Sequence, residues 1–383
     1  MAAPPTHGLA DEHLALRDLA RQVAEEQIAP HAAEVDERGE FTEKSLRALV
    51  AAGLHCLGMP EEYGGQGGDH LASAVVAEEI ARVCATTQQV YGANELFSLP
   101  LLLAGSDEIK QRYLPRIARG EWLGAFALSE PEAGSDVGAI ATRATRTPGG
   151  WVLRGTKRWI TNAGHADVYI VFASTDPEAG GRGLSAFVVE AGDTGLTFGA
   201  PERKMGLKGS PTCEVYLDHV TLPADRLIGR PGDGMRIALG TLDRTRTTVA
   251  SQAVGIAQGA LDTAAAYLVE RRQFGQPLAS FQGLQFMVAD MEIQIRAARA
   301  LTHAAARELD AGGTDITTGG AVAKCFASDT AMKVTTDAVQ LLGGAGYVKD
   351  FPVERMMRDA KVTQIYEGTN QIQRVVVARS ILA

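Results

Sequence analysis

Apolar residues recur at helical spacing along the first third of the chain. The first such run places its apolar positions at Leu16, Leu19, Ala20, Val23 and Ala24, which share one face of an α-helix. Pro30 predicts the end of that helix, because a proline inside a helix removes a backbone hydrogen bond. Similar patterns predict helices over residues 45–52, 71–82 and 108–117, and glycines predict a loop over residues 60–68. We therefore expect an N-terminal helical domain over residues 1–120.

The middle of the chain changes to short runs rich in β-branched and aromatic residues, which glycine and proline separate. These runs are residues 151–155, 168–172, 184–189 and 213–217. Their length and spacing are typical of strands joined by turns. They predict a small antiparallel β domain or barrel over residues 121–232.

From residue 234 onward the pattern returns to long helices. They are predicted over residues 234–271, 281–311, 316–342 and 370–382, where many alanines give high helix propensity. We expect these helices to form a C-terminal four-helix bundle over residues 233–383. The chain as a whole is then an α+β protein of three domains.

Charge and cysteine usage exclude several classes of function. The formal net charge is −9, which argues against a nucleic-acid partner and against an anionic membrane surface. The eight histidines show no HxxxH spacing, and Cys56, Cys84, Cys213 and Cys325 form no CxxC pair. We therefore expect no metal site and no disulfide framework. The first nine residues lack the features of a secretory signal, and no run is apolar enough to span a membrane. These observations predict a cytoplasmic protein with free thiols.

One carboxylate near the C-terminus stands between an aromatic residue and a glycine. The segment is Tyr366-Glu367-Gly368-Thr369. Glycine allows a sharp turn, and an aromatic neighbour that excludes water raises a carboxyl pKa and makes the group a better base near neutrality. The same residues also suit a helix N-terminus, with Glu367 in the first turn and Thr369 as the cap. From these residues alone, a cap and a catalytic base are equally good interpretations.

Five motifs in the chain resemble those of one known family. Residues 365–374 (IYEGTNQIQR) resemble the C-terminal signature of the acyl-CoA dehydrogenases, of the short- and medium-chain type. The others are residues 128–136 (LSEPEAGSD), 157–162 (KRWITN), 271–275 (RRQFG) and 340–347 (QLLGGAGY). They follow the order of the family, and the resemblance extends over nearly the whole chain.

The resemblance implies FAD-dependent α,β-dehydrogenation of an acyl-CoA thioester to the trans-2-enoyl-CoA, a reaction of fatty acid metabolism. A base removes the α-proton, and a hydride leaves the β-carbon for the flavin N5. Some members of the family carry the base on the helix that begins the C-terminal domain. The matching residues 241–250 contain no glutamate, so the base is assigned to Glu367. The backbone N–H of Glu367, beside Gly368, is then a donor to the developing enolate oxygen.

The resemblance also implies the residues that bind FAD. Around the flavin ring it places backbone groups and the Ser129 and Thr161 hydroxyls; Trp159 could shield the ring, although by itself it would be a half-buried residue at a strand end. Arg271 suits the pyrophosphate, since a guanidinium binds phosphate in a planar fork, although alone it would be a solvated arginine at a helix end. The complete implied set is Phe126, Leu128, Ser129, Trp159, Ile160, Thr161, Arg271, Phe274, Gln282, Gln340, Gly343, Gly344, Thr369 and Gln371. Of these, Gln340, Gly343 and Gly344 would reach the FAD of a neighbouring subunit.

The implied substrate contacts are Ser135, Asp243, Arg246, Tyr366 and Gly368. Asp243 and Arg246 are three residues apart, so they could instead pair with each other on one helix face. Glu130 and Asp136 are interpreted as structural residues. The stretch Asn94–Pro100 aligns with the helix that closes the acyl pocket, where an aromatic Phe97 would favour short acyl chains unless the ring only packs in the core.

The resemblance implies two partners besides the acyl-CoA: an electron-transfer flavoprotein as the electron acceptor, and further copies of the chain in a homotetramer. Two other enzyme functions remain as alternatives, an acyl-CoA oxidase and a dehydrogenase of acyl groups bound to a carrier protein. A non-catalytic scaffold of the same fold ranks lower, because Glu367, Arg271, Gln340, Gly344 and Thr369 are all present.

Overall fold

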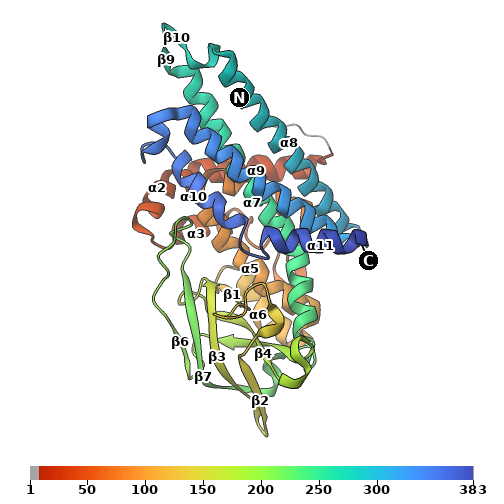
Figure 1. Cartoon of the computed structure of the whole chain (residues 1–383). Coiled ribbons are helices and arrows are strands. Elements are labelled where there is room, and N and C mark those ends of the chain that lie inside the picture. The colour runs from red at the N-terminus through yellow and green to blue at the C-terminus, as the bar shows by residue number, and fades with distance from the viewer. Residues whose placement is uncertain (1–7, 383) are drawn as a thin grey trace.

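The computed structural model describes residues 8–382. Residues 1–7, on which most of the expectation about a secretory signal rests, lie outside this range. A β-sheet forms one end of the molecule, and the long helices extend away from it to the other end (Figure 1). No helix within residues 8–382 combines the length and apolar character needed to span a bilayer.

The N-terminal part is helical, as expected. Its helices are α1 (Asp11–Val23), α2 (Ala29–Arg38), α3 (Glu43–Ala51), α4 (His70–Val83), α5 (Ala85–Ala104) and α6 (Asp107–Ala118). The sequence pattern did not predict α5 as a separate helix. This helix is buried around most of its circumference, so its sequence lacks the alternation of apolar and polar faces that marks a surface helix.

The prediction that the first helix ends at Pro30 was wrong. A π-helical turn, Ala24–Ile28, follows α1, and the backbone N–H of Ala29 bonds to the carbonyl of Ala24. Pro30 then falls in the first turn of α2, where its missing N–H costs nothing. The wider turn lets the chain continue as a helix through the proline.

The middle part is one sheet of eight strands. They are β1 (Gly124–Ala127), β2 (Arg143–Thr147), β3 (Gly150–Thr161), β4 (Val168–Ser174), β5 (Leu184–Glu190), β6 (Leu196–Phe198), β7 (Thr212–Pro223) and β8 (Leu227–Ile228). Most neighbours pair antiparallel, as predicted, in the order β6-β7-β3-β2-β4-β5-β8. However, β1 pairs parallel with β4. The β2–β3 hairpin lies between them in sequence and supplies the long crossover that a parallel pair requires.

The C-terminal part is a helical bundle whose fourth member differs from the prediction. Three long helices form it: α7 (Gly234–Glu270), α8 (Gln282–Asp310) and α9 (Ile316–Leu342). The fourth helix in their common core is α10 (Val353–Thr363), which the sequence pattern did not predict. The predicted helix α11 (Asn370–Leu382) packs against α9. A short hairpin of β9 (Arg272–Gln273) and β10 (Gln276–Pro277) stands at the tip farthest from the sheet (Figure 1).

Candidate active site

Glu367 lies in a tight turn between α10 and α11. Both Glu367 and Gly368 adopt left-handed backbone conformations, with φ of 51° and 91°. A Cβ at Gly368 would lie 2.5 Å from the side-chain nitrogen of Gln373, so the turn requires the glycine. A left-handed conformation in a glutamate is strained and persists where the surroundings enforce it.

Buried polar groups of α9 and α11 enforce this turn. The Lys324 Nζ donates to the Gly368 carbonyl at 2.8 Å and to Asn370 Oδ1 at 3.0 Å. Gln373 Nε2 also donates to the Gly368 carbonyl, at 3.0 Å. Burial lowers the pKa of Lys324 to about 8. Lys324 could not be identified from the sequence, because nothing local relates a lysine on α9 to a turn 44 residues later.

The helix-cap interpretation and the base interpretation are compatible. The Thr369 hydroxyl accepts a hydrogen bond from the backbone N–H of Ile372 at 3.3 Å, as a cap of α11 does. The Glu367 carboxyl is not used for capping. Its Oε2 accepts a hydrogen bond from the Thr245 hydroxyl of α7 at 2.6 Å.

The environment of the Glu367 carboxyl favours its neutral form. The side chain is partly exposed, yet surrounding protein raises its pKa to about 7. Burial is the largest cause; the Thr245 hydrogen bond opposes it, the Glu95 carboxylate adds to it, and the Lys324 and Arg246 charges oppose it. A carboxyl with a pKa near 7 is suited to accept a proton from a weak carbon acid.

Two of the predicted substrate residues are paired with each other. Arg246 Nη1 donates to Asp243 Oδ1 at 2.5 Å, on one face of α7. The Thr317 hydroxyl of α9 donates to the other oxygen of Asp243 at 2.7 Å. Asp243 and Arg246 therefore pair with each other, which is the interpretation that needs no ligand. Both residues nevertheless lie within one helical turn of Thr245, which holds Glu367. Ser135 is exposed on the loop after β1.

The residues predicted to line the flavin ring come from the C-terminal ends of β1 and β3. Trp159 lies in an irregularity of the β3–β7 pairing, with a φ of 62°, and its side chain is 54% exposed. A bulge of this kind turns a side chain out of the strand alternation. The backbone N–H of Arg158 donates to the Ser129 carbonyl at 2.9 Å, which brings the two segments together. The Ser129 and Thr161 side chains are partly exposed.

Other members of this predicted group have buried side chains. Leu128 and Ile160 are buried, and the partly buried Phe126 ring packs on Phe172 with ring centres 5.0 Å apart. Leu128 and Ile160 thus have mainly backbone groups to offer a ligand. Leu128 also shares a hydrophobic cluster with Leu242 of α7, which connects this segment to the helix that carries Thr245.

Six of the predicted FAD contacts lie far from Glu367 within one chain. Thr245 and Glu270 are 25 residues apart on α7, which corresponds to roughly 38 Å at 1.5 Å per residue. Arg271, Phe274 and Gln282 therefore lie at the tip away from the sheet (Figure 1). Arg271 borders a cavity of about 340 Å³ there, together with Tyr267 and Phe351.

The other three residues, Gln340, Gly343 and Gly344, lie at the end of α9 or directly after it. Phe351, which follows them in the chain, packs edge-on against Tyr267 of α7. All six residues are exposed, Phe274 to 92%. An FAD molecule cannot extend from Glu367 to Arg271 of the same chain. The resemblance implies a neighbouring subunit only for the 340–344 segment. The geometry requires the same of Arg271, Phe274 and Gln282 if they bind this cofactor.

The Phe97 ring points into the core. It is fully buried, packs edge-on against Tyr113, and lies against Gly124 of β1, where an added Cβ would come within 2.4 Å of Phe97 Cβ. This arrangement favours the packing interpretation over a role as the floor of the acyl pocket.

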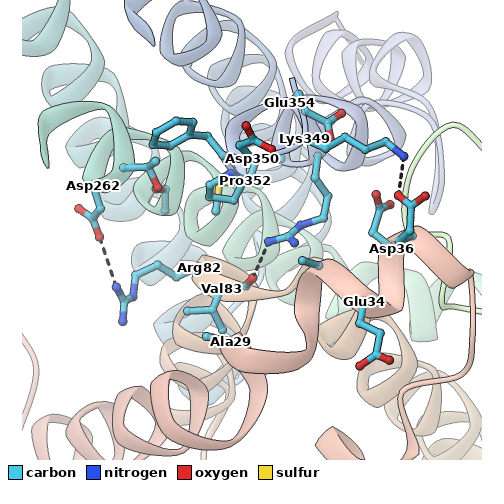
Figure 2. A pocket seen from close by; sticks show the side chains of 17 residues that line it. Ala29, Glu34, Asp36, Arg82, Val83, Asp262, Lys349, Asp350, Pro352 and Glu354 are labelled. Carbon is cyan, nitrogen blue, oxygen red and sulfur yellow. Dashed lines mark hydrogen bonds and ion pairs between the residues drawn. The ribbon is translucent and has the colours of Figure 1, made fainter. Parts of the chain in front are cut away.

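A larger cavity of about 560 Å³ lies between α2, α4, α7 and residues 349–356 (Figure 2). Its charged side chains pair with one another, as in Arg82–Asp262 and Lys349–Glu37. None of the predicted site residues lines it. We interpret it as a gap between structural elements and not as the site of chemistry.

The chain belongs to the acyl-CoA dehydrogenase family. The N-terminal, middle and C-terminal domains of that family match residues 10–121, 125–220 and 232–382. The chain is 53% identical over 98% of its length to the "Probable acyl-CoA dehydrogenase fadE25" of Mycobacterium leprae, of which it covers 96%.

Two of the solved structures that share its fold show the likeness. The butyryl-CoA dehydrogenase of Megasphaera elsdenii is 41% identical over the full length of both chains, with a TM-score of 0.96. A structure described as the electron transferring flavoprotein of Acidaminococcus fermentans is 44% identical over 98% of this chain and 99% of that one, also with a TM-score of 0.96.

Proposed function

We propose that Glu367 removes the α-proton when this FAD-dependent acyl-CoA dehydrogenase oxidises its thioester to the trans-2-enoyl-CoA. The observation that carries the proposal is the Glu367 carboxyl itself. It is held by Thr245 in a turn that Gly368 and Lys324 fix, and its pKa is about 7. No other predicted site residue combines a basic oxygen with such an environment.

The same turn supplies a donor for the substrate carbonyl. No hydrogen bond within residues 8–382 uses the backbone N–H of Glu367, which leaves it available to a ligand. Removing an α-proton places negative charge on the thioester oxygen, and a fixed N–H beside that oxygen lowers the energy of the transition state. The strained backbone thus presents the base and a donor from the same residue.

The residues at the C-terminal ends of β1 and β3 fit a flavin. The exposed Trp159 ring, turned out by the irregular strand pairing, and the partly exposed Ser129 and Thr161 hydroxyls form an aromatic and hydrogen-bonding surface. FAD is the hydride acceptor of the reaction when it is bound. Cytoplasmic localisation is part of the proposal, supported by the four free cysteines of residues 8–382.

The pH dependence of flavin reduction tests the role of Glu367. The base must be ionised, so the single-turnover rate should rise with pH through about 7, the pKa of Glu367. The Thr245 hydrogen bond stabilises the ionised form of Glu367. Thr245→Val should raise that pKa by about one to two units, since a hydrogen bond to a charged group contributes about 1.5–3 kcal/mol. Thr241→Val is the matched control, because the Thr241 hydroxyl bonds only to its own helix at Ile237. Identical pH profiles in all three proteins would contradict the assignment.

We also propose that the active unit is a homotetramer that passes its electrons to an electron-transfer flavoprotein. Support for assembly comes from the distance between the two groups of FAD residues and from the exposure of Phe274 and Tyr347, at 92% and 87%. Large exposed apolar side chains grouped at one end mark an interface. Support for the acceptor comes from the likeness to the Acidaminococcus structure.

Light scattering and flavin content test the assembly. Gln340→Ala should weaken FAD retention, since Gln340 would contact the cofactor of another subunit, yet leave the rate of flavin reduction per bound FAD unchanged. Gln22→Ala, an exposed position on α1, is the control. A fully flavin-loaded, active monomer would rule the tetramer out.

A further inference from the structure

Helix α5 exposes one narrow stripe in an otherwise buried surface. Gly92, Glu95 and Leu99 are partly exposed, whereas most of their neighbours on the helix are buried. Positions three and four residues apart lie on the same face of a helix. This helix packs against α7 and against β1, so it touches both the helix that carries Thr245 and the sheet.

Glu95, the acidic residue of this stripe, accepts a hydrogen bond from a threonine of α7, as Glu367 does. The Thr248 hydroxyl of α7 donates to Glu95 Oε2 at 2.8 Å, and the Thr245 hydroxyl donates to Glu367 Oε2 at 2.6 Å. The two threonines are one helical turn apart, with their Cβ atoms about 5–6 Å from each other. Two carboxyls from distant parts of the sequence are thereby positioned side by side along α7.

Glu95 is an unexpected residue for a surface that would contact the alkyl chain of a thioester bound at Glu367. Surrounding protein raises its pKa to about 7, mainly through burial, as it does for Glu367. Its other oxygen, Oε1, makes no hydrogen bond within residues 8–382, and the atom is not fully buried. Once an acyl chain covers this oxygen, it costs free energy unless the ligand supplies a hydrogen bond, and leucine would pack better against methylene groups.

We propose that Glu95 is a specificity-determining residue that hydrogen-bonds a hydroxyl group on the acyl chain, a few carbons beyond the α-carbon. This inference rests on the proposed role of Glu367, because the reacting carbon must lie at that residue. With the α-carbon at Glu367, the next carbons of the acyl chain lie toward Glu95, because the threonines that hold the two carboxyls, Thr245 and Thr248, are one helical turn apart. A hydroxyl suits this carboxyl in either ionisation state, whereas an ammonium group would also have to lose its hydration in a partly buried site.

The test compares matched substrates in matched variants. The substrates are hexanoyl-CoA and its 4-, 5- and 6-hydroxy derivatives, and the variants are Glu95→Gln and Glu95→Leu, with the exposed Glu12→Leu as control. For wild type and the control we expect a kcat/KM at least about tenfold higher for one hydroxy isomer than for hexanoyl-CoA. Glu95→Leu should reverse that preference. Glu95→Gln keeps a hydrogen-bonding oxygen and should retain part of it.

The outcomes separate this inference from the proposed function. If wild type reduces its flavin with hexanoyl-CoA but prefers it to all three hydroxy isomers, the role of Glu95 is wrong and the dehydrogenase function stands. An unchanged preference in Glu95→Leu, with normal flavin content, also overturns the inference. If none of the four thioesters reduces the flavin of the wild type, the inference fails, whereas the proposed function fails only if thioesters of other chain lengths also leave the flavin oxidised.

Discussion

Glu367→Gln is expected to lower the rate of flavin reduction by acyl-CoA by roughly 100- to 10,000-fold, the range typical of losing a general base. Glutamine keeps the size of the side chain and can still accept the Thr245 hydrogen bond that Glu367 Oε2 accepts at 2.6 Å. It cannot take a proton from carbon. The measurement is anaerobic stopped-flow absorbance of the flavin after mixing with saturating acyl-CoA.

Binding controls keep this result interpretable. The glutamine variant should retain FAD and should bind acyl-CoA, because the turn depends on Gly368, Lys324 and Gln373 and not on the charge of residue 367. A variant that loses FAD reports on folding. A flavin-loaded variant that reduces its cofactor at near the wild-type rate would show that the base is elsewhere.

Lys157→Met is expected to lower the free energy of unfolding by about 3–5 kcal/mol, because it leaves a buried carboxylate without its partner. Lys157 is fully buried and donates to Glu130 Oε1 at 2.7 Å and to the Leu128 carbonyl at 3.0 Å. Burial alone would raise the pKa of Glu130, but the Lys157 charge and hydrogen bonds hold it below its usual value. The pair also fixes Leu128 beside Ser129, so FAD retention should fall with stability.

A second substitution distinguishes charge from packing. Glu130 also accepts hydrogen bonds from the backbone N–H groups of Ala141 and Thr142, at 2.6 and 3.0 Å. Glu130→Gln in the Lys157→Met background removes the unpaired charge and keeps an oxygen for these donors. Denaturant titration should show that the double variant recovers part of the lost stability. A loss below about 1 kcal/mol in Lys157→Met alone would mean that the buried pair is not important for stability.

The sequence predicted the elements whose pattern is local. The long helices α7, α8 and α9 are alanine-rich and were located to within a residue or two. Four of the eight strands, β3, β4, β5 and β7, were found as cores of longer strands, whereas the shorter strands β1, β2, β6 and β8 were not predicted. Helix α5 was missed because it is buried on nearly every side. The π-helical turn before Pro30 was missed because a proline signals a helix end far more often than it signals a wider turn.

The site was only partly predictable. Motifs identified Glu367 and Gly368, but the residues that tune the carboxyl come from other elements. Thr245 lies in a stretch from which the sequence indicated only Asp243, Arg246 and the absence of a glutamate, and Glu95 lies in one that indicated only acyl-chain length. Which side chains of α5, α7 and α9 face one another depends on how the helices are rotated and shifted when packed, and a single sequence does not contain that information.

Anaerobic titration of the flavin-loaded wild-type protein with acyl-CoA thioesters of increasing chain length tests the central claim most directly. The account predicts that the oxidised flavin absorbance disappears with at least one of them, and that mass spectrometry finds an enoyl-CoA lighter than its substrate by the two hydrogens removed. A flavin that stays oxidised with every thioester, while a chemical reductant still bleaches it, would contradict the account.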